Sequence, residues 1–222
     1  MRINIFEGIL IPFVGTTLGA ACVFFMRKTL SKSVQRALAG FAAGIMVAAS
    51  IWSLLIPAIK QSENMGTLSF VPAVAGFWIG ILFLLALDHL IPHLHVGSDQ
   101  AEGPKSKLGR TTMMVLAVTL HNIPEGMATF MASNTDISLG ISLTIAIALH
   151  NIPEGISISV PIYYATNSKI KAISYTALSG LSELFGAIIT YLFLKPFIND
   201  IIMGLLFSII AGIMMHLSLI HI

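Results

Sequence analysis

The sequence carries the same six residues, HNIPEG, at positions 121–126 and again at positions 150–155. Residues four apart lie on one face of a helix, so His121 shares a face with Glu125, and His150 with Glu154. Each copy therefore presents an imidazole together with a carboxylate, and an asparagine amide stands beside them.

Imidazole with carboxylate suits zinc, iron, manganese, cobalt, nickel or cadmium better than it suits calcium or magnesium. The only cysteine, Cys22, lies in neither motif, which argues against a copper(I) site or a tight structural zinc site. Nitrogen and oxygen ligands also allow the moderate affinity that a transported ion needs in order to leave. The motifs therefore predict a site for a divalent transition metal.

A third carboxylate, Glu183, lies in the segment SGLSE at positions 179–183, in the middle of a later apolar stretch. It would complete a second metal position alongside Glu125 and Glu154, or it would be a protonated hydrogen-bond donor. We favour the ligand, because two other acidic residues belong to the same predicted site.

The alternative to a metal site is a set of structural polar contacts, such as hydrogen bonds or an ion pair between helices. None of the apolar stretches contains an internal lysine or arginine. A charged carboxylate in the middle of a membrane costs at least ~2.5 kcal/mol on insertion scales. Because the protein supplies no cation to offset this cost, a bound metal ion is the favoured explanation.

The composition is that of a membrane protein: 56% of the 222 residues are hydrophobic and only 10% are charged, whereas soluble domains carry about a quarter charged residues. The 12 basic and 10 acidic residues nearly balance, so no nucleic-acid partner is indicated, and one cysteine excludes an intrachain disulfide. We predict an all-α transmembrane bundle forming a single domain, 1–222, in a lipid bilayer. Its seven expected spans are Phe6–Met26, Ala37–Ile59, Phe70–Pro92, Thr111–Met131, Ile137–Tyr163, Ile170–Leu194 and Ile201–Ile220.

The basic residues indicate an orientation. Nine lysines and arginines fall in alternate connections, and only Arg2, Lys60 and Lys195 fall on the other side. Because cytoplasmic loops carry the excess of basic residues, we expect the N-terminus outside and the hydrophilic segment 93–110 to be a cytoplasmic loop.

Each motif also contains a proline, which removes one backbone hydrogen bond from a helix. Pro124 would leave the carbonyl of Leu120 without its donor, and Pro153 that of Leu149. Kinked or broken helices near the bilayer midplane commonly form the substrate sites of transporters. The prolines therefore favour a transport site.

The paired HNIPEG motifs, the segment SGLSE and the segment DHLIPHLH at positions 88–95 resemble the ZIP family of metal-ion transporters, most closely its GufA-like bacterial branch. The likeness runs from about Gly15 to Gly212. It implies zinc uptake across the bacterial cytoplasmic membrane, with no separate cofactor, and a homodimer. It also implies a binuclear site, with one position formed by His121, Glu125, His150 and Glu154 and the other by Asn122, Glu125, Asn151, Glu154 and Glu183.

The chain departs from the family pattern in two places. Leu184 follows Glu183 where the family often has proline. The family has eight helices with both termini outside, whereas this sequence ends in its seventh span and loses the resemblance after Gly212. We therefore expect a truncated C-terminus, and His216 and His221 receive no role from the family.

A cluster of possible ligands, Asp88, His89, His93 and His95, follows the third span. Two interpretations stay open: a station that accepts the ion leaving the central site, or a polar cluster at the membrane surface. Replacing His93 and His95 by alanine without changing uptake or its inhibition by metal would exclude the release station.

Two other functions compete with transport. A membrane-embedded zinc hydrolase needs one open zinc position, usually with three protein ligands, yet here the ligands are duplicated and no HExxH motif is present. A metal sensor or scaffold would bind the ion without moving it. A single catalytic centre does not account for the duplicated ligands, and zinc uptake into proteoliposomes separates transport from both alternatives.

Overall fold

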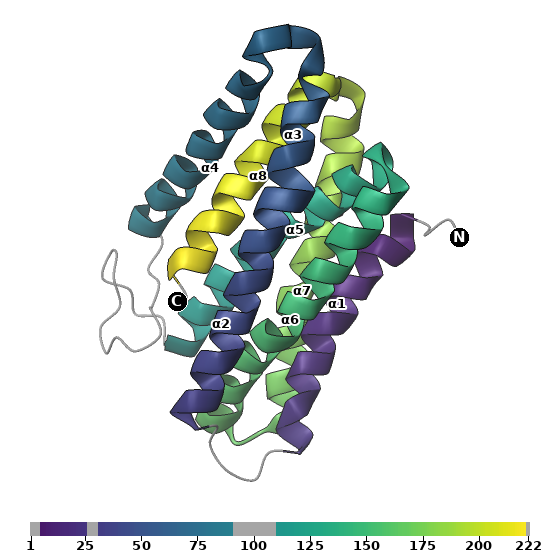
Figure 1. The fold of residues 1–222 in the computed structure, drawn as a ribbon. Coiled ribbons are helices and arrows are strands. Elements are labelled where there is room, and N and C mark those ends of the chain that lie inside the picture. Colours follow the sequence, from purple (N-terminus) through teal and green to yellow (C-terminus); the bar gives the residue numbers. More distant parts are fainter. Residues whose placement is uncertain (1–4, 26–30, 91–109, 221–222) are drawn as a thin grey trace.

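The computed structural model describes residues 5–25, 31–90 and 110–220, and every regular element in these ranges is helical (Figure 1). The all-α prediction is therefore confirmed. The α-helices are α1 (Ile5–Ala21), α2 (Lys32–Ala48), α3 (Ile56–Gln61), α4 (Phe70–Leu90), α5 (Arg110–Thr135), α6 (Ile137–Thr166), α7 (Lys169–Ile189) and α8 (Asp200–Ile220). The shorter turns are 3-10 helices at η1 (Cys22–Phe24), η3 (Glu63–Leu68) and η5 (Lys195–Phe197), and π-helices at η2 (Ala49–Leu55) and η4 (Thr190–Leu194).

Each predicted span corresponds to one helical rod of the described structure. The second rod joins α2, η2 and α3 into Lys32–Gln61, and the sixth joins α7, η4 and η5 into Lys169–Phe197. By length and composition, five rods among the described residues are able to cross a membrane, and the first span contains a shorter apolar helix, Leu10–Phe24. Helix α5 is not among these five, but its 26 residues extend about 39 Å, enough for the hydrocarbon core.

Short, capped connections fix how the motif-bearing helices meet. Only Asp136 separates α5 from α6, and its carboxylate accepts a hydrogen bond from the backbone of Leu139, 2.9 Å away. After α6, Asn167 adopts a left-handed conformation (φ 51°) and the hydroxyl of Ser168 caps α7. Side-chain caps of this kind satisfy the first free amides of a helix. As a result α6 runs antiparallel to both α5 and α7, α5 and α7 run parallel to each other, and all three are neighbours.

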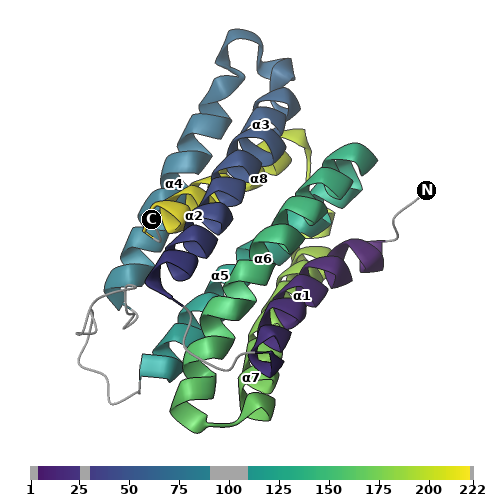
Figure 2. The ribbon, with the colours of Figure 1, turned by 60° about the horizontal axis from the view of Figure 1, so that its bottom comes forward.

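The helices form two groups (Figure 2). Helices α1, α5, α6 and α7 pack together, and α4 and α8 pack with the rod α2–α3. The groups meet mainly through α6 against α2 and η2, and through α5 against α8. This boundary is apolar, with Met46, Leu54, Leu143, Ile147 and Phe207 buried in one cluster.

Glycines allow close backbone contact inside the first group. A side chain at Gly126 of α5 would strike the backbone of Glu183 on α7, and one at Gly186 of α7 would strike the backbone of Ile123. A side chain at Gly155 of α6 would likewise strike the backbone of Thr16 on α1. Small residues that let backbones approach are typical of packed transmembrane helices. The glycines of the two motifs therefore hold α5 against α7 and α6 against α1.

Candidate metal centre

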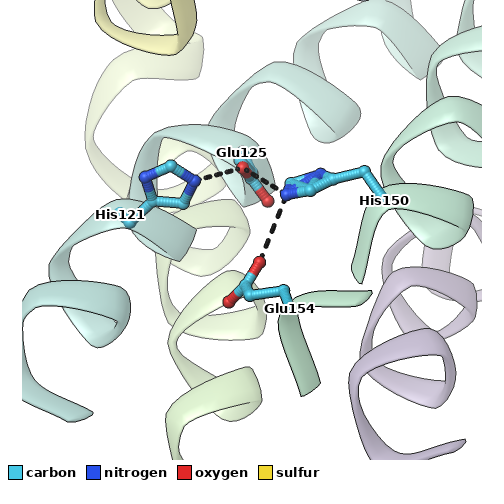
Figure 3. Close-up of side chains that lie close together, drawn as sticks. All are labelled: His121, Glu125, His150 and Glu154. Atoms are coloured by element: carbon cyan, nitrogen blue, oxygen red, sulfur yellow. Dashed lines mark ion pairs between the residues drawn. The ribbon is translucent and has the colours of Figure 1, made fainter. Parts of the chain in front are cut away.

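The two motifs lie side by side within the first helix group and point toward each other (Figure 3). On α5, His121 Nε2 lies 3.0 Å from Glu125 Oε1, and on α6, His150 Nε2 lies 3.2 Å from Glu154 Oε2. The helices are joined by the contact between His150 Nε2 and Glu125 Oε1, at 3.6 Å. The face-sharing expected from the i, i+4 spacing and the facing of the motifs are both confirmed.

The four side chains have dimensions that suit a small cation. One potential ligand atom from each of His121, Glu125, His150 and Glu154 lies within 4.8 Å of the others. In a tetrahedral zinc site with bonds of about 2.0–2.1 Å, neighbouring ligand atoms are about 3.3 Å apart. The three measured nitrogen–oxygen distances, 3.0, 3.2 and 3.6 Å, scatter around that value. The spacing of the four atoms is compatible with one shared ion.

Burial makes this arrangement expensive without a cation. Glu125 is 1% exposed and His150 is 2% exposed. Among the described residues, the buried polar set contains no lysine or arginine. The second oxygen of Glu125, Oε2, is buried without a hydrogen-bond partner in the described part of the chain. Buried polar atoms normally have a partner, so a ligand that supplies one is the simplest explanation.

The remaining predicted residues adjoin these four. Glu183 on α7 is 1% exposed and interacts electrostatically with both Glu125 and Glu154. Its Oε1 accepts a hydrogen bond from Asn151 Nδ2 at 2.6 Å. Asn122 is completely buried, and its amide interacts with Glu154 without forming a well-aligned hydrogen bond. The structure therefore brings all seven predicted residues into one buried polar region.

Helix α1 contributes to this region, which sequence reasoning missed. Its Pro12 carbonyl accepts a hydrogen bond from Asn151 Nδ2 at 3.2 Å, and its Thr16 hydroxyl lies 3.4 Å from Glu183 Oε1. The sequence does contain a signal for this contact: Gly15 and Gly19 are four residues apart, and small residues at this spacing are typical of closely packed membrane helices. A side chain at either glycine would strike the backbone of α6.

The prolines of the motifs do not interrupt the helices that carry them. Helix α5 continues without interruption through Pro124, and α6 continues through Pro153 and also through Pro161. The departures from α-helical geometry lie instead in the π-helical turns η2 and η4 of other rods. The motif side chains are therefore presented by continuous helices, and no broken helix forms the site.

The other predicted groups fall partly outside the described residues. His93, His95, His221 and nearly all of the loop 93–110 lie there. The backbones of Asp88 and His89 belong to the last turn of α4, and their side chains are not among those described. His216 lies on α8, away from the four-residue cluster. The release station remains a prediction.

Comparison with known proteins agrees with the geometry. Residues 97–222, more than half of the chain, match the ZIP zinc transporter family. The likeness therefore continues beyond Gly212, where the sequence analysis ended it. The zinc transporter ZupT of Nitratidesulfovibrio vulgaris is 36% identical over 225 residues, covering 93% of this chain and 81% of that protein. The ZupT proteins of Salmonella arizonae and Salmonella heidelberg are each 38% identical, covering 94% of this chain and 83% and 84% of their own lengths.

These relatives cover nearly the whole chain, and the residues matched by the family model include both motifs. The relatives are transporters rather than enzymes, which removes the zinc hydrolase from consideration. The protein is a multi-pass membrane protein that transports divalent metal ions, and it belongs to the ZIP zinc transporter family.

Proposed function

We propose that this transporter carries zinc into the cytoplasm through the buried region formed by the two motifs. The observation that carries the proposal is the cluster of His121, Glu125, His150 and Glu154, drawn from two antiparallel helices and all within bonding reach of one ion. The same ligand chemistry accepts iron, manganese, cobalt, nickel and cadmium, because affinity order alone does not select among such metals.

We assign these four residues to one ion position. A second position would use Asn122, Asn151 and Glu183, with Glu125 and Glu154 bridging between the two. Support comes from Oε2 of Glu183 and Oδ1 of Asn151, which are both buried and make no hydrogen bond to the described residues. An ion sheds water onto these nitrogen and oxygen atoms, and their moderate affinity lets it leave.

Release to the other side requires movement around the site, and the packing suggests which helices move. The glycine contacts bind α5 to α7 and α6 to α1, whereas the boundary with the rod α2–α3 and α8 is apolar. We therefore propose that α1, α5, α6 and α7 shift together against the other group.

The protein is further proposed to lie in the bacterial cytoplasmic membrane with its N-terminus outside, and to form a homodimer. The orientation rests on the basic residues: Lys32 and Arg36 begin α2, Arg110 begins α5, and Lys169 and Lys171 begin α7. Labelling an introduced cysteine near residue 2 in intact cells with a membrane-impermeant reagent would support this orientation, and labelling only after lysis would reverse it.

Transport should weaken in acid. Imidazole and carboxylate ligands must lose their protons before they bind a metal, so protons compete with zinc. Lowering the pH on the zinc side from about 7 to about 5 is expected to raise the half-saturating zinc concentration several-fold. Initial rates in proteoliposomes measure this, with protein-free liposomes as the control for leakage. A rate that increases on acidification would instead indicate that protons drive uptake.

The function is tested by zinc uptake into proteoliposomes containing the wild type or Glu154→Ala. We expect saturable uptake by the wild type, inhibited by competing divalent metals, and near-background uptake by the variant. Zinc binding without uptake by the wild type would favour a sensor over a transporter. Equal uptake by wild type and variant would remove the motifs from the transport path.

A further inference from the structure

The first helix makes contacts with the buried region that go beyond packing. Thr16 is completely buried, and its hydroxyl lies between two acceptors, 3.4 Å from Glu183 Oε1 and 3.5 Å from the carbonyl of Pro12. Other buried threonines bond the carbonyl four residues back more tightly, for example Thr129 at 2.9 Å and Thr176 at 2.8 Å. The hydroxyl of Thr16 is therefore drawn away from its own helix.

The cause lies on α6. Asn151 Nδ2 donates both to the Pro12 carbonyl, at 3.2 Å, and to Glu183 Oε1, at 2.6 Å. An amide nitrogen has two hydrogens, so these two contacts use both of them. They also decide which way the amide is turned, leaving Oδ1 as its free acceptor. Asn151 thus shares both acceptors of the Thr16 hydroxyl, the Pro12 carbonyl and Glu183 Oε1.

The same contacts determine which oxygen of Glu183 is free. Both donors, Asn151 Nδ2 and Thr16 Oγ1, act on Oε1, while Oε2 is buried and makes no hydrogen bond to the described residues. Glu183 thus has one oxygen held by the protein and one left for another partner. The free oxygens of Glu183 and Asn151 are the atoms that a second ion position needs.

The position of Thr16 is itself enforced by packing. A side chain at Gly180 of α7 would lie 3.3 Å from the Thr16 methyl group, and a side chain at Gly155 of α6 would strike the Thr16 backbone. Thr16 therefore packs on α7 one turn before Glu183, against a helix that approaches closely. Little room remains for its hydroxyl to turn elsewhere.

We propose that Thr16 is a positioning residue for ion binding, which holds the carboxylate of Glu183, together with Asn151, so that one oxygen of each faces the ion. This inference rests on the proposed metal site. Residues that orient metal ligands typically contribute 10- to 100-fold in affinity, so the role is measurable.

The test compares zinc uptake by Thr16→Val, Thr16→Ser and the matched control Thr17→Val in proteoliposomes. Thr17 neighbours Thr16, but within the described part of the chain its hydroxyl bonds the Phe13 carbonyl of its own helix, at 2.9 Å, and no residue of the buried region. Thr16→Val keeps the shape and removes the hydroxyl, and we expect it to raise the half-saturating zinc concentration about 10-fold. Thr16→Ser should restore it to within about twofold of the wild type, and Thr17→Val should leave it unchanged.

Several outcomes would overturn the proposal. Zinc uptake by Thr16→Val equal to that of the wild type would contradict it. A larger loss of uptake in Thr16→Ser than in Thr16→Val would also contradict it, because the packing of the methyl group would then matter more than the hydroxyl. If Thr16→Val lowers the melting temperature in detergent, Thr16→Ala is tested in its place. Unchanged zinc uptake by a stable Thr16→Ala variant would contradict the positioning role of Thr16. Glu125→Gln is measured in the same experiment. If this variant transports zinc normally, the proposed metal site itself is wrong. If it loses transport while Thr16→Val transports normally, the metal site stands and only the role of Thr16 is refuted.

Discussion

Replacing Glu125 with glutamine is expected to reduce zinc uptake at least about 100-fold, because it removes a ligand, and even residues that only orient ligands contribute 10- to 100-fold. Glu125 Oε1 is the atom that lies near both imidazoles, 3.0 Å from His121 Nε2 and 3.6 Å from His150 Nε2. Glutamine keeps the length and shape of the side chain but loses the negative charge. Initial rates of zinc entry into proteoliposomes, and zinc affinity measured in detergent, should fall together.

Glu63→Gln is the matched control for this prediction. It makes the same chemical change at an exposed carboxylate in η3, outside the buried region. Its uptake should equal that of the wild type. If both variants transport normally, Glu125 does not bind the transported ion, and if both lose transport, the change in charge acts through the protein as a whole.

The second large effect is expected from Gly126→Ala. The added methyl group would meet the backbone of Glu183, which cannot turn aside as a flexible side chain would. Overpacking of this kind typically costs about 1–3 kcal/mol and forces the backbone to shift. We expect a lower melting temperature in detergent and a loss of most zinc uptake, because α5 and α7 would separate at the level of the metal centre.

Gly44→Ala provides the comparison. Gly44 also lies within a helix, α2, but an added methyl group would meet nothing within 4 Å. Alanine is favoured over glycine in helices by about 0.5–1 kcal/mol, so this variant should be as stable as the wild type or slightly more so. Equal behaviour of Gly126→Ala and Gly44→Ala would show that the close contact between α5 and α7 is not needed.

The main features of the site could be predicted from the sequence because they depend on local geometry. The i, i+4 spacing places His121 above Glu125, and a one-residue turn at Asp136 forces the two motifs to face each other. The apolar stretches likewise locate the rods, since only helices satisfy their own backbone in a single membrane-spanning segment.

The rest depends on contacts between distant parts of the chain. Nothing about Thr16 as a residue type distinguishes it from Thr17, and only the packing of α1 on α6 and α7 gives it a role. The π-helical turn at η2 also has no obvious sequence marker, although it lies at the boundary between the two helix groups. Pro124 lies inside α5 without ending it; sequence predicts the lost hydrogen bond, but whether the helix continues past a proline depends on the fold around it.

The central claim is that the transported ion binds between the two HNIPEG motifs, and locating zinc in the zinc-loaded protein tests it most directly. Anomalous diffraction at the zinc absorption edge should show a peak within about 2.0–2.2 Å of His150 Nε2 and the Glu125 carboxylate. In Glu125→Gln the peak should be lost or much weaker. Zinc found only elsewhere, in protein that transports it normally, would contradict the account.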